Sequence, residues 1–186
     1  MKIYKAGGII PFCQIGSERY LLLQRRTKMK NGKIEYGKYE DLGGRKSKIE
    51  KQNNHPIINT AIREASEETN FVYSGDIIKG YIGITAECKQ KSDEFFINRI
   101  DPNFISNKTI PYAVFLVKVE EDQKFPNEVY GNYEHTDRFH RVLSWVKLTE
   151  FEKIVQNNNL HPRIIKCAQQ IRKKILTNLK KSCPNV

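Results

Sequence analysis

The stretch Arg63–Asn70, REASEETN, gathers three glutamates within five residues of a chain whose formal net charge is +11. This clustering is unfavourable on its own, because each carboxylate raises the electrostatic energy of its neighbours. On a helix that advances about 100° per residue, Glu64, Glu67 and Glu68 share one arc of the surface. The sequence therefore predicts an acidic cluster whose repulsion must be offset by something else.

A helical period in the apolar residues places this cluster at the edge of a buried face. The face recurs at three- and four-residue steps and consists of Ile58, Ala61, Ile62, Ala65 and Thr69. We expect the helix to begin near Pro56, since proline suits the first helical position, and to end at Asn70. The carboxylates then lie between core and solvent, where a hard divalent cation offsets their repulsion. A solvated charged face is the alternative that this pattern alone leaves open.

Basic charge is concentrated in two segments. Residues 25–51 carry ten Lys or Arg against four acids, a net of +6, and residues 161–186 carry seven and no acid, a net of +7. The positive electrostatic potential of such segments attracts anionic partners, namely phosphate, nucleic acid or polyphosphate. The alternative, that these side chains only keep the protein in solution, is stronger for the C-terminal segment than for the first.

Length and composition favour one globular domain over residues 1–186, with residues 161–186 as a basic C-terminal helix packed on it or extending from it. The chain begins without the features of a signal peptide, and no run approaches the ~18 apolar residues of a membrane span. We expect a cytoplasmic protein without a membrane partner. Its cysteines lack zinc-ligand spacing and are interpreted as reduced thiols: Cys13, Cys88, Cys167 and Cys183.

Apolar runs predict strands, which together with the two helices indicate an α+β fold. The expected strands cover residues 3–15, 20–25, 77–84, 94–100, 112–119 and 142–147. The first two meet at a turn over Gly16-Ser17, and the pair Gly7-Gly8 indicates a bulge or the close approach of another backbone. Residues 27–44, TKMKNGKIEYGKYEDLGG, are interpreted as a polar loop, and a terminal helix is expected over residues 162–181.

Around the acidic helix the chain resembles the Nudix hydrolase family. The box of that family runs G-x5-E-x7-R-E-U-x-E-E-x-G-U, where U is a bulky apolar residue. Here Gly44-x5-Glu50 matches the first half, and Arg63-Glu64-Ala65-x-Glu67-Glu68-x-Asn70-Phe71 matches the second. The resemblance extends to the strand that ends in Arg25-Arg26 and to SWVKLTEF from Ser144, which is similar to a late strand and helix start of the family.

The match departs from the family at three points. Twelve residues separate Glu50 from Arg63 where the family has seven, and we infer an insertion around residues 52–56, since loops absorb added residues at modest entropic cost. Asn70 replaces the box glycine, and asparagine is the usual substitute where positive φ is needed. Ala65 is a small apolar residue on the buried face.

The resemblance implies a Nudix-type α/β/α sandwich with a mixed β-sheet. It also implies hydrolysis of a pyrophosphate bond in a nucleoside-diphosphate-linked substrate, with Mg²⁺ or Mn²⁺ as cofactor. The chemistry of the reaction agrees with these residues, because water attacking two adjoining phosphates needs a metal to lower its pKa and a carboxylate to accept its proton.

Matching to the box assigns roles to individual residues. The catalytic residues are Glu64, Glu67 and Arg63, with Glu64 the leading general base if it is not used as a metal ligand. The metal ligands are Glu64, Glu67, Glu68, the Gly44 carbonyl and Glu50, which alternatively orients Arg63. The substrate-binding candidates are Arg25, Arg26, Arg45, Lys46 and Glu134. Glu134 is preferred as a late acid over Glu120, Glu121 and Glu128, although all four could equally be solvated loop acids.

The favoured substrate is an RNA 5′ end, either a cap or a triphosphate, because the basic segments could follow a phosphate backbone beyond the scissile bond. Free nucleotides and diphosphoinositol polyphosphates are alternative anionic substrates. A third reading is a catalytically inactive Nudix-fold module that binds phosphate or RNA. The stretched box favours that reading, whereas the three helix glutamates favour an enzyme.

Overall fold

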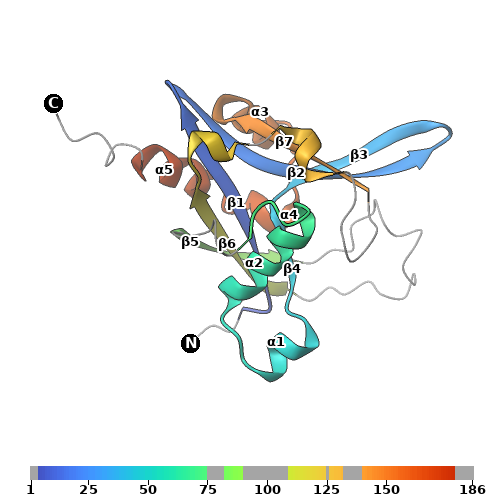
Figure 1. The fold of residues 1–186 in the computed structure, drawn as a ribbon, viewed down its shortest axis with the longest axis vertical. Coiled ribbons are helices and arrows are strands. Elements are labelled where there is room, and N and C mark those ends of the chain that lie inside the picture. Colours follow the sequence, from blue (N-terminus) through green and yellow to red (C-terminus); the bar gives the residue numbers. More distant parts are fainter. Residues whose placement is uncertain (1–3, 75–81, 90–108, 125, 132–139, 179–186) are drawn as a thin grey trace.

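A mixed seven-stranded sheet lies at the centre of the computed structural model, which describes residues 4–74, 82–89, 109–124, 126–131 and 140–178 (Figure 1). Its strands are β1 (Ala6–Ile15), β2 (Glu18–Lys30), β3 (Lys33–Glu40), β4 (Leu42–Arg45), β5 (Ile82–Lys89), β6 (Thr109–Lys118) and β7 (Arg141–Lys147). The strand order is β3-β2-β1-β6-β5, and β4 also pairs with β1 and β7 with β2. Strands β1 and β6 run parallel, and the other described pairs are antiparallel.

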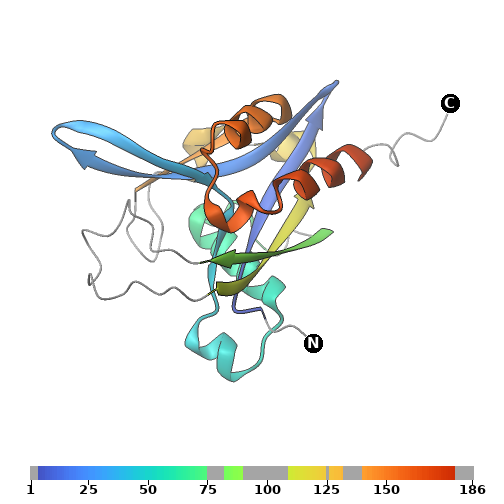
Figure 2. The same ribbon diagram turned by 180° about the vertical axis from the view of Figure 1, so that it is seen from behind.

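Helices cover both faces of this sheet. They are α1 (Lys48–Gln52), α2 (Ile57–Glu68), α3 (Leu148–Gln156), α4 (Pro162–Ile165) and α5 (Ala168–Asn178), with two short 3₁₀ helices, η1 (Glu121–Gln123) and η2 (Asn127–Tyr130). Seen from behind, α3, α4 and α5 lie in front of the sheet, on the face opposite α2 (Figure 2). The expected α/β/α arrangement is therefore confirmed.

Strand β1 joins the two layers because its side chains alternate between the faces of the sheet. Ile10 and Phe12 belong to the core beneath α3, α4 and α5. Ile9 and Cys13 belong to the second core, where Ala65 of α2 packs. All four of these β1 side chains are fully buried, which explains why the strand reads as a nearly continuous apolar run.

The pair Gly7-Gly8 faces a second glycine pair across the β1–β4 ladder, with Gly7 opposite Gly44 and Gly8 opposite Gly43. A Cβ atom on Gly43 would lie 2.4 Å from the Gly8 Cα and 2.3 Å from the Tyr112 hydroxyl oxygen. The close backbone approach predicted for Gly7-Gly8 is confirmed. It brings β4, which ends at the acidic helix, against the centre of the sheet.

The loop interpretation of residues 27–44 is wrong, because this segment forms most of a long hairpin and a fourth strand. Strands β2 and β3 pair out to Lys30 and Lys33, and the turn between them consists of Asn31 and Gly32 with φ of 52° and 74°. Positive φ at both central positions is the type I′ geometry, whose sequence signal is Asn-Gly. That signal stands in the sequence, and the polar composition around it concealed the hairpin.

Helix α2 carries the acidic stretch and differs from expectation at both ends. Pro56 is its N-cap rather than its first residue, since a ψ of 143° leaves it extended. The helix ends at Glu68, and Asn70 then adopts a φ of 52°, so the positive φ expected at this box position is confirmed. The following residue, Phe71, also has positive φ, at 64°.

The terminal helix expected over residues 162–181 is interrupted. A hydrogen bond from the Cys167 amide to the Ile164 carbonyl tightens the chain between α4 and α5 into a turn of 3₁₀ type. The apolar stripe is still buried in the core, through Ile164, Ala168, Ile171 and Ile175. Across the described ranges, none of the helices is long and apolar enough to cross a membrane.

The remaining expected strands are found where the structure describes the chain. Residues 3–15, 20–25, 112–119 and 142–147 correspond to β1, β2, β6 and β7. Strand β5 begins at Ile82, late in the segment expected over residues 77–84, and continues to Lys89. The strand expected over residues 94–100 lies outside the described residues.

The glycine contact predicts a steric effect on stability. We expect Gly43→Ala to lower the free energy of unfolding by about 2–3 kcal/mol, because the added methyl group meets backbone atoms that cannot move aside. Gly16→Ala is the control, since that site is open and only its φ of +57° opposes alanine, at about 1 kcal/mol. Urea unfolding measures both, and equal losses would contradict the close-packing argument.

Candidate active site

Helix α1 fixes the first glutamate of the box. Ser47 caps the helix by accepting a hydrogen bond from the Glu50 amide at 3.1 Å, and the Ser47 amide donates to Glu50 Oε2 at 2.6 Å. The carboxylate held in this way accepts hydrogen bonds from Arg63 Nε at 3.1 Å and Nη2 at 3.2 Å. Of the twelve residues between Glu50 and Arg63, residues 51–56 form the end of α1 and the turn to Pro56, and residues 57–62 begin α2, so the two partners still meet.

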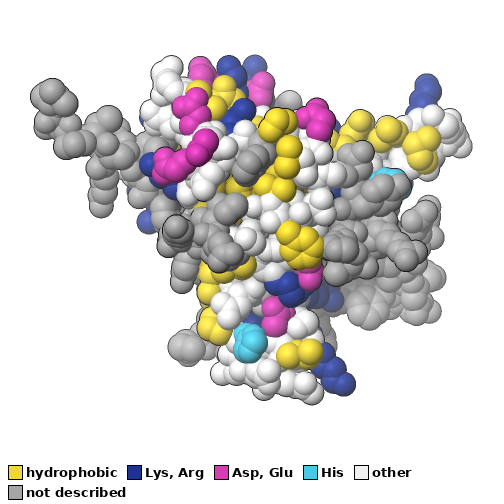
Figure 3. Space-filling view, viewed as in Figure 1, with side chains coloured by type: hydrophobic (Ala, Val, Ile, Leu, Met, Phe, Trp, Pro, Cys, Tyr) yellow, Lys and Arg dark blue, Asp and Glu magenta, His cyan; other side chains and the backbone are white. Residues whose placement is uncertain are grey.

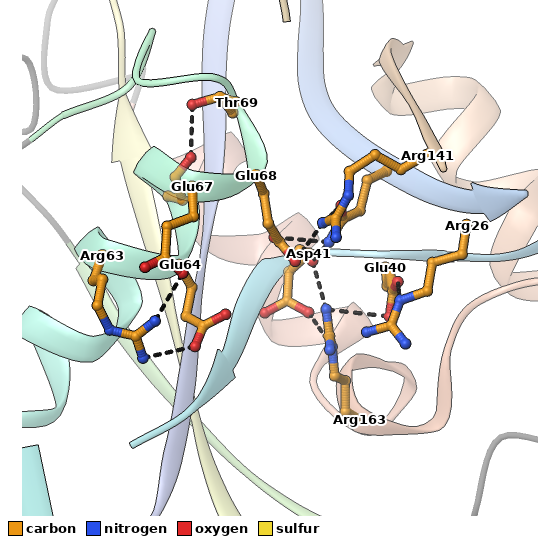
Figure 4. A network of polar contacts seen from close by, with 12 residues as sticks. Arg26, Glu40, Asp41, Arg63, Glu64, Glu67, Glu68, Thr69, Arg141 and Arg163 are labelled. Carbon is orange, nitrogen blue, oxygen red and sulfur yellow. Dashed lines mark hydrogen bonds and ion pairs between the residues drawn. The ribbon is translucent and has the colours of Figure 1, made fainter. Parts of the chain in front are cut away.

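Arg63 is the centre of the acidic cluster, a name that from here on means Glu50, Glu64 and Glu67. Figure 4 shows Glu64 and Glu67 beside its guanidinium. Its Nη2 donates to Glu64 Oε1 at 2.7 Å and its Nη1 donates to Glu67 Oε2 at 2.8 Å. Nη2 also donates to the Arg45 carbonyl at 3.0 Å. Three carboxylates share one guanidinium, which leaves a formal excess of two negative charges.

Burial makes the ionised carboxylates of this cluster less stable, in addition to their mutual repulsion. The Glu64 and Glu67 side chains are only 12% and 15% exposed. Burial raises the pKa of Glu64 to about 7, and the nearby charges of Glu68 and Glu67 act in the same direction. Burial also opposes ionisation of Glu50, but the hydrogen bonds from Arg63 and Ser47 outweigh it and lower the pKa of that carboxyl.

Gly44 leaves room for the Glu64 carboxylate. A Cβ atom at this glycine would lie 2.3 Å from Glu64 Oε2 and 2.4 Å from its carboxyl carbon. The carboxylate therefore occupies the space that the side chain of any residue other than glycine at position 44 would need. This contact brings the glycine of the first half of the box against the helix of the second half.

The donor set of this cluster suits a hard divalent cation. Carboxylate oxygens that lack a full complement of positive charge are the ligands that Mg²⁺ and Mn²⁺ prefer. The side chains that fit are Glu64, whose carboxylate lies against Gly44, and Glu67, which shares Arg63 with it. Within the described part of the chain, no three His, Cys, Asp or Glu side chains stand together in a metal-binding arrangement.

Glu68 faces away from the cluster and into the protein (Figure 4). Its Oε1 lies 2.6 Å from Arg141 Nη1 of β7, and its Oε2 accepts a hydrogen bond from Gln24 Nε2 of β2 at 2.8 Å. Arg141 Nη1 also donates to Gln24 Oε1 at 2.7 Å, so the three side chains form a closed triangle. All three are at least 98% buried. Glu68 is thus held by the sheet, apart from Glu64 and Glu67.

The triangle belongs to a larger buried network of charged groups. The Asp41 carbonyl accepts hydrogen bonds from Gln24 Nε2 at 2.9 Å and from Arg163 Nη2 at 2.6 Å. Arg163 of α4 also pairs with the Asp41 carboxylate at 2.6 Å and with Glu40 at 3.2 Å, and Arg26 pairs with Glu40 at 2.9 Å. Three carboxylates, from Glu40, Asp41 and Glu68, therefore meet three guanidinium groups.

The charges of this network affect its two adjacent acids differently. Burial opposes ionisation of Glu40, but Arg163 and Arg26 outweigh it and lower the pKa to about 2. Burial dominates at Asp41 and raises its pKa, although Arg163 and the hydroxyl of Tyr112 bind the carboxylate. The Tyr112 hydroxyl donates to Asp41 Oδ2 at 2.8 Å. Tyr112 is therefore a buried part of the network.

The substrate-binding candidates are dispersed. Arg25 stacks between two tyrosines of the hairpin, and Arg26 pairs with buried Glu40. The Arg45 carbonyl binds Arg63 while its side chain is exposed, and the Lys46 ammonium donates to the His55 carbonyl. Glu134 lies outside the described residues. Of these candidates, Arg45 and Lys46 directly follow Gly44 and so lie next to the cluster.

Sequence reasoning did not identify Gln24, Asp41, Arg141 or Arg163 as part of the site. A weak signal exists, because Gln24 follows three leucines and Arg141 precedes Val142-Leu143, so each is a polar residue that directly adjoins an apolar run. A polar residue in such a place requires a buried partner. The partner itself cannot be identified from local pattern.

Comparisons with known proteins bear on the fold. No protein-family model matches the chain, and no curated protein matches its sequence. The C. elegans Ap4A hydrolase, solved as a binary complex, matches with a TM-score of 0.53 and 13% identity, over 94% of this chain and 99% of that protein. A MutT/Nudix family protein from Listeria innocua matches with a TM-score of 0.54 and 14% identity, over 96% of both chains.

A third similar structure is the NUDIX domain of Shewanella oneidensis NrtR, solved with ADP-ribose. It matches with a TM-score of 0.53 and 11% identity, over 94% of this chain and 90% of that one. Likenesses at such low identity establish a shared fold. The expected Nudix-type sandwich is confirmed by them.

The buried triangle predicts a large effect on stability. We expect Arg141→Met to lower the free energy of unfolding by about 3–5 kcal/mol, because it leaves the Glu68 charge buried without its ion pair. Arg172→Met is the matched control, since the Arg172–Glu152 pair is exposed and its loss costs about 1 kcal/mol or less.

A double variant tests the cause of that loss. Adding Glu68→Gln to Arg141→Met removes the uncompensated charge and should restore part of the stability measured by urea unfolding. Glu68→Gln is also measured by itself. If adding it to Arg141→Met lowers stability by as much as it does in the unmodified protein, the two residues do not interact as described.

Proposed function

We propose that this chain, which has the Nudix fold, hydrolyses a pyrophosphate bond in a nucleoside-diphosphate-linked substrate with the help of Mg²⁺ or Mn²⁺. The observation that carries the proposal is the acidic cluster, in which Glu50, Glu64 and Glu67 meet at the guanidinium of Arg63. A fold hosts many functions, so the argument depends on these side chains and not on the sandwich that presents them.

The Glu67 carboxylate and the Gly44 carbonyl are the proposed oxygen ligands, and Glu64 joins them only where it does not serve as the base. A cation held there supplies positive charge for the phosphates and makes a water molecule easier to deprotonate. Glu68 was expected to join this set, but it is held by Arg141 and Gln24. We therefore assign Glu68 to the fixing of the C-terminal end of α2 against the sheet.

The residues of the cluster divide the remaining work. Glu64 is the proposed general base, with Oε1 bound by Arg63 and Oε2 lying against Gly44. Arg63 holds Glu64 and Glu67 through separate N–H groups, so both carboxylates are oriented before substrate arrives. Glu50 in turn orients Arg63 and is itself fixed by the cap of α1.

The favoured substrate within this class is an RNA 5′ end, either capped or triphosphorylated. The support is the charge of the chain, since ten Lys or Arg lie in residues 25–51 and seven lie in residues 161–186. A basic surface of this kind attracts a polyanion that extends beyond the reacting phosphates. Ap4A, which stands in the name of one similar enzyme, and ADP-ribose, the ligand bound in another similar structure, represent the alternative of a free nucleotide.

A substrate panel tests this preference. Capped RNA, triphosphorylated RNA, free cap nucleotide, Ap4A, ADP-ribose and a diphosphoinositol polyphosphate are each incubated with the protein and Mg²⁺ or Mn²⁺. We expect hydrolysis of the RNA ends with the highest kcat/KM. Turnover of the small molecules alone would overturn the RNA preference, and turnover of none would overturn the enzyme.

A second candidate function is a Nudix-fold module that binds phosphate or RNA without hydrolysing it. The specific observation in its favour is that Glu68 is held in an ion pair with Arg141. The two candidates differ in the panel, because the module binds one of these anions and leaves its phosphoanhydride bonds intact.

The cluster predicts a loss of activity on charge removal. We expect Glu67→Gln to lower kcat/KM by about a hundredfold or more, because it removes a carboxylate that acts together with Glu64. Glu18→Gln is the control, since Glu18 pairs with Lys147 on the surface at 3.5 Å and should leave the rate unchanged. The rate of product formation from the best substrate of the panel provides the measurement.

Gly44→Ala separates activity from stability. The added methyl group would overlap the Glu64 carboxylate, which is the flexible end of a side chain and can move aside. We expect the melting temperature to change by less than about 3 °C, whereas kcat falls about tenfold or more because the carboxylate is displaced. Unchanged kcat would show that the position of Glu64 against Gly44 does not matter for the reaction.

A further inference from the structure

The hairpin of β2 and β3 extends beyond the rest of the sheet (Figure 1). We call residues 25–39 the β2–β3 arm. Among the described residues, the outermost hydrogen bond between β2 and the β7 side runs from the Thr27 amide to the His140 carbonyl, and β3 bridges to Leu160 at Tyr39. Outward from these points, the strand pairing that the structure describes is that of β2 with β3.

One face of the arm is apolar and exposed. Met29 pairs with Ile34 and Thr27 pairs with Tyr36, so Met29, Ile34 and Tyr36 project on the same side. Their exposed fractions are 68%, 55% and 48%, and they are three of the six large hydrophobic residues exposed in the described part of the chain. Figure 3 shows hydrophobic side chains along the arm, with Lys or Arg near its outer end. A gathering of this kind marks a binding surface.

A fixed cation holds the aromatic part of this face. The Arg25 guanidinium lies 4.7 Å from the ring centre of Tyr36 and 4.8 Å from that of Tyr39. Arg25 Nε also donates to the Gly37 carbonyl at 2.9 Å, within the same hairpin. The rings are therefore oriented in advance, and Tyr36 still offers nearly half of its surface to a partner.

The opposite face and the tip of the arm are basic. Lys28 and Lys30 lie at 3.4 Å on either side of Glu35, and Lys33 and Lys38 are exposed. Apart from the Arg26–Glu40 pair at its base, the hairpin holds five basic residues against one acidic residue. The occupant that matches this charge is a polyanion, and the occupant that matches the exposed ring and apolar face carries flat, stackable groups. Single-stranded RNA has both.

Strand β2 connects the arm to the candidate active site. Gln24, the residue immediately before the arm, donates to Glu68 at 2.8 Å, and Glu68 is the neighbour of Glu67 on α2. This contact is buried, so it fixes the base of the arm relative to the helix that carries the acidic cluster and is not itself a surface path for a nucleotide chain.

We propose that the β2–β3 arm binds the single-stranded RNA that follows the 5′ end, with bases stacked on Tyr36, Met29 and Ile34 and phosphates contacted by the lysines. The link to the 5′ end rests on the proposed function. Binding of RNA to the arm does not, because it requires neither a pyrophosphate nor hydrolysis.

The test uses a fluorescent oligoribonucleotide with a 5′ hydroxyl, which has no bond for the enzyme to cleave. Fluorescence anisotropy gives Kd for the full chain and for two arm variants, Tyr36→Ser and the triple variant Lys28→Gln, Lys30→Gln, Lys33→Gln. We expect about a tenfold weaker Kd for Tyr36→Ser from the loss of stacking. The triple variant should lower the slope of log Kd against log salt by about two.

A charge-matched control lies on other elements. The triple variant Lys153→Gln, Lys166→Gln, Lys173→Gln changes exposed lysines of or beside α3, α4 and α5. It should weaken binding less than the arm variant of equal charge. Equal weakening by both triples, or a Tyr36→Ser protein that binds as tightly as the unmodified chain, would overturn the proposal. Circular dichroism confirms that each variant is folded.

Two further measurements separate the arm from its alternatives. Sedimentation reports a second copy of the chain as occupant: a dimer that Met29→Ser with Ile34→Ser abolishes, without effect on RNA affinity, would overturn the proposal. Hydrolysis is scored separately with triphosphorylated RNA. RNA binding that depends on the arm, in a protein that cleaves no substrate, would sustain this inference while the proposed function fails.

Discussion

Three carboxylates and two guanidinium groups are buried together, and a third guanidinium, that of the partly exposed Arg26, pairs with one of these carboxylates. Each of these charges would be prohibitively unstable if buried alone. Because their partners come from β2, the β3–β4 junction, α2, β7 and α4, these elements can approach only in an arrangement that satisfies all the charges together. Hydrophobic burial supplies the drive to collapse, and the network selects which collapsed arrangement is allowed.

Helix α2 carries glutamates of two kinds within one turn: some whose charge is only partly compensated, and one whose charge is fully paired. On one side, Glu64 and Glu67 share a single guanidinium and retain excess negative charge. On the other side, Glu68 is neutralised by Arg141 and braced by Gln24. The rigid, compensated side anchors the helix, so the uncompensated side can hold its unfavourable charge in place for a ligand. Glu68 thus contributes to stability, whereas its neighbours Glu64 and Glu67 belong to the candidate site.

Local pattern predicted the parts of the structure whose causes are local. The apolar period of α2, the strand runs of β1, β6 and β7, and the positive φ at Asn70 each depend on neighbouring residues. The β2–β3 hairpin was also local, but its Asn31-Gly32 signal was outweighed by polar composition. The buried network could not be predicted, because Arg163 and Asp41 are 122 residues apart and Arg141 and Gln24 are 117 apart. Such partners are chosen by tertiary geometry, which periodicity does not encode.

The capped helix α1 has a consequence for how such motifs diverge. The Glu50 carboxylate accepts hydrogen bonds from the Ser47 amide, which caps α1, and from Arg63 of α2. One side chain therefore links the two helices. In this chain the contact between Arg63 and Glu50 is kept at about 3 Å although twelve residues separate the two along the sequence. Spacers of other lengths are therefore tolerated wherever they return the two groups to this distance, and a search pattern with a fixed gap will overlook the chains that contain them.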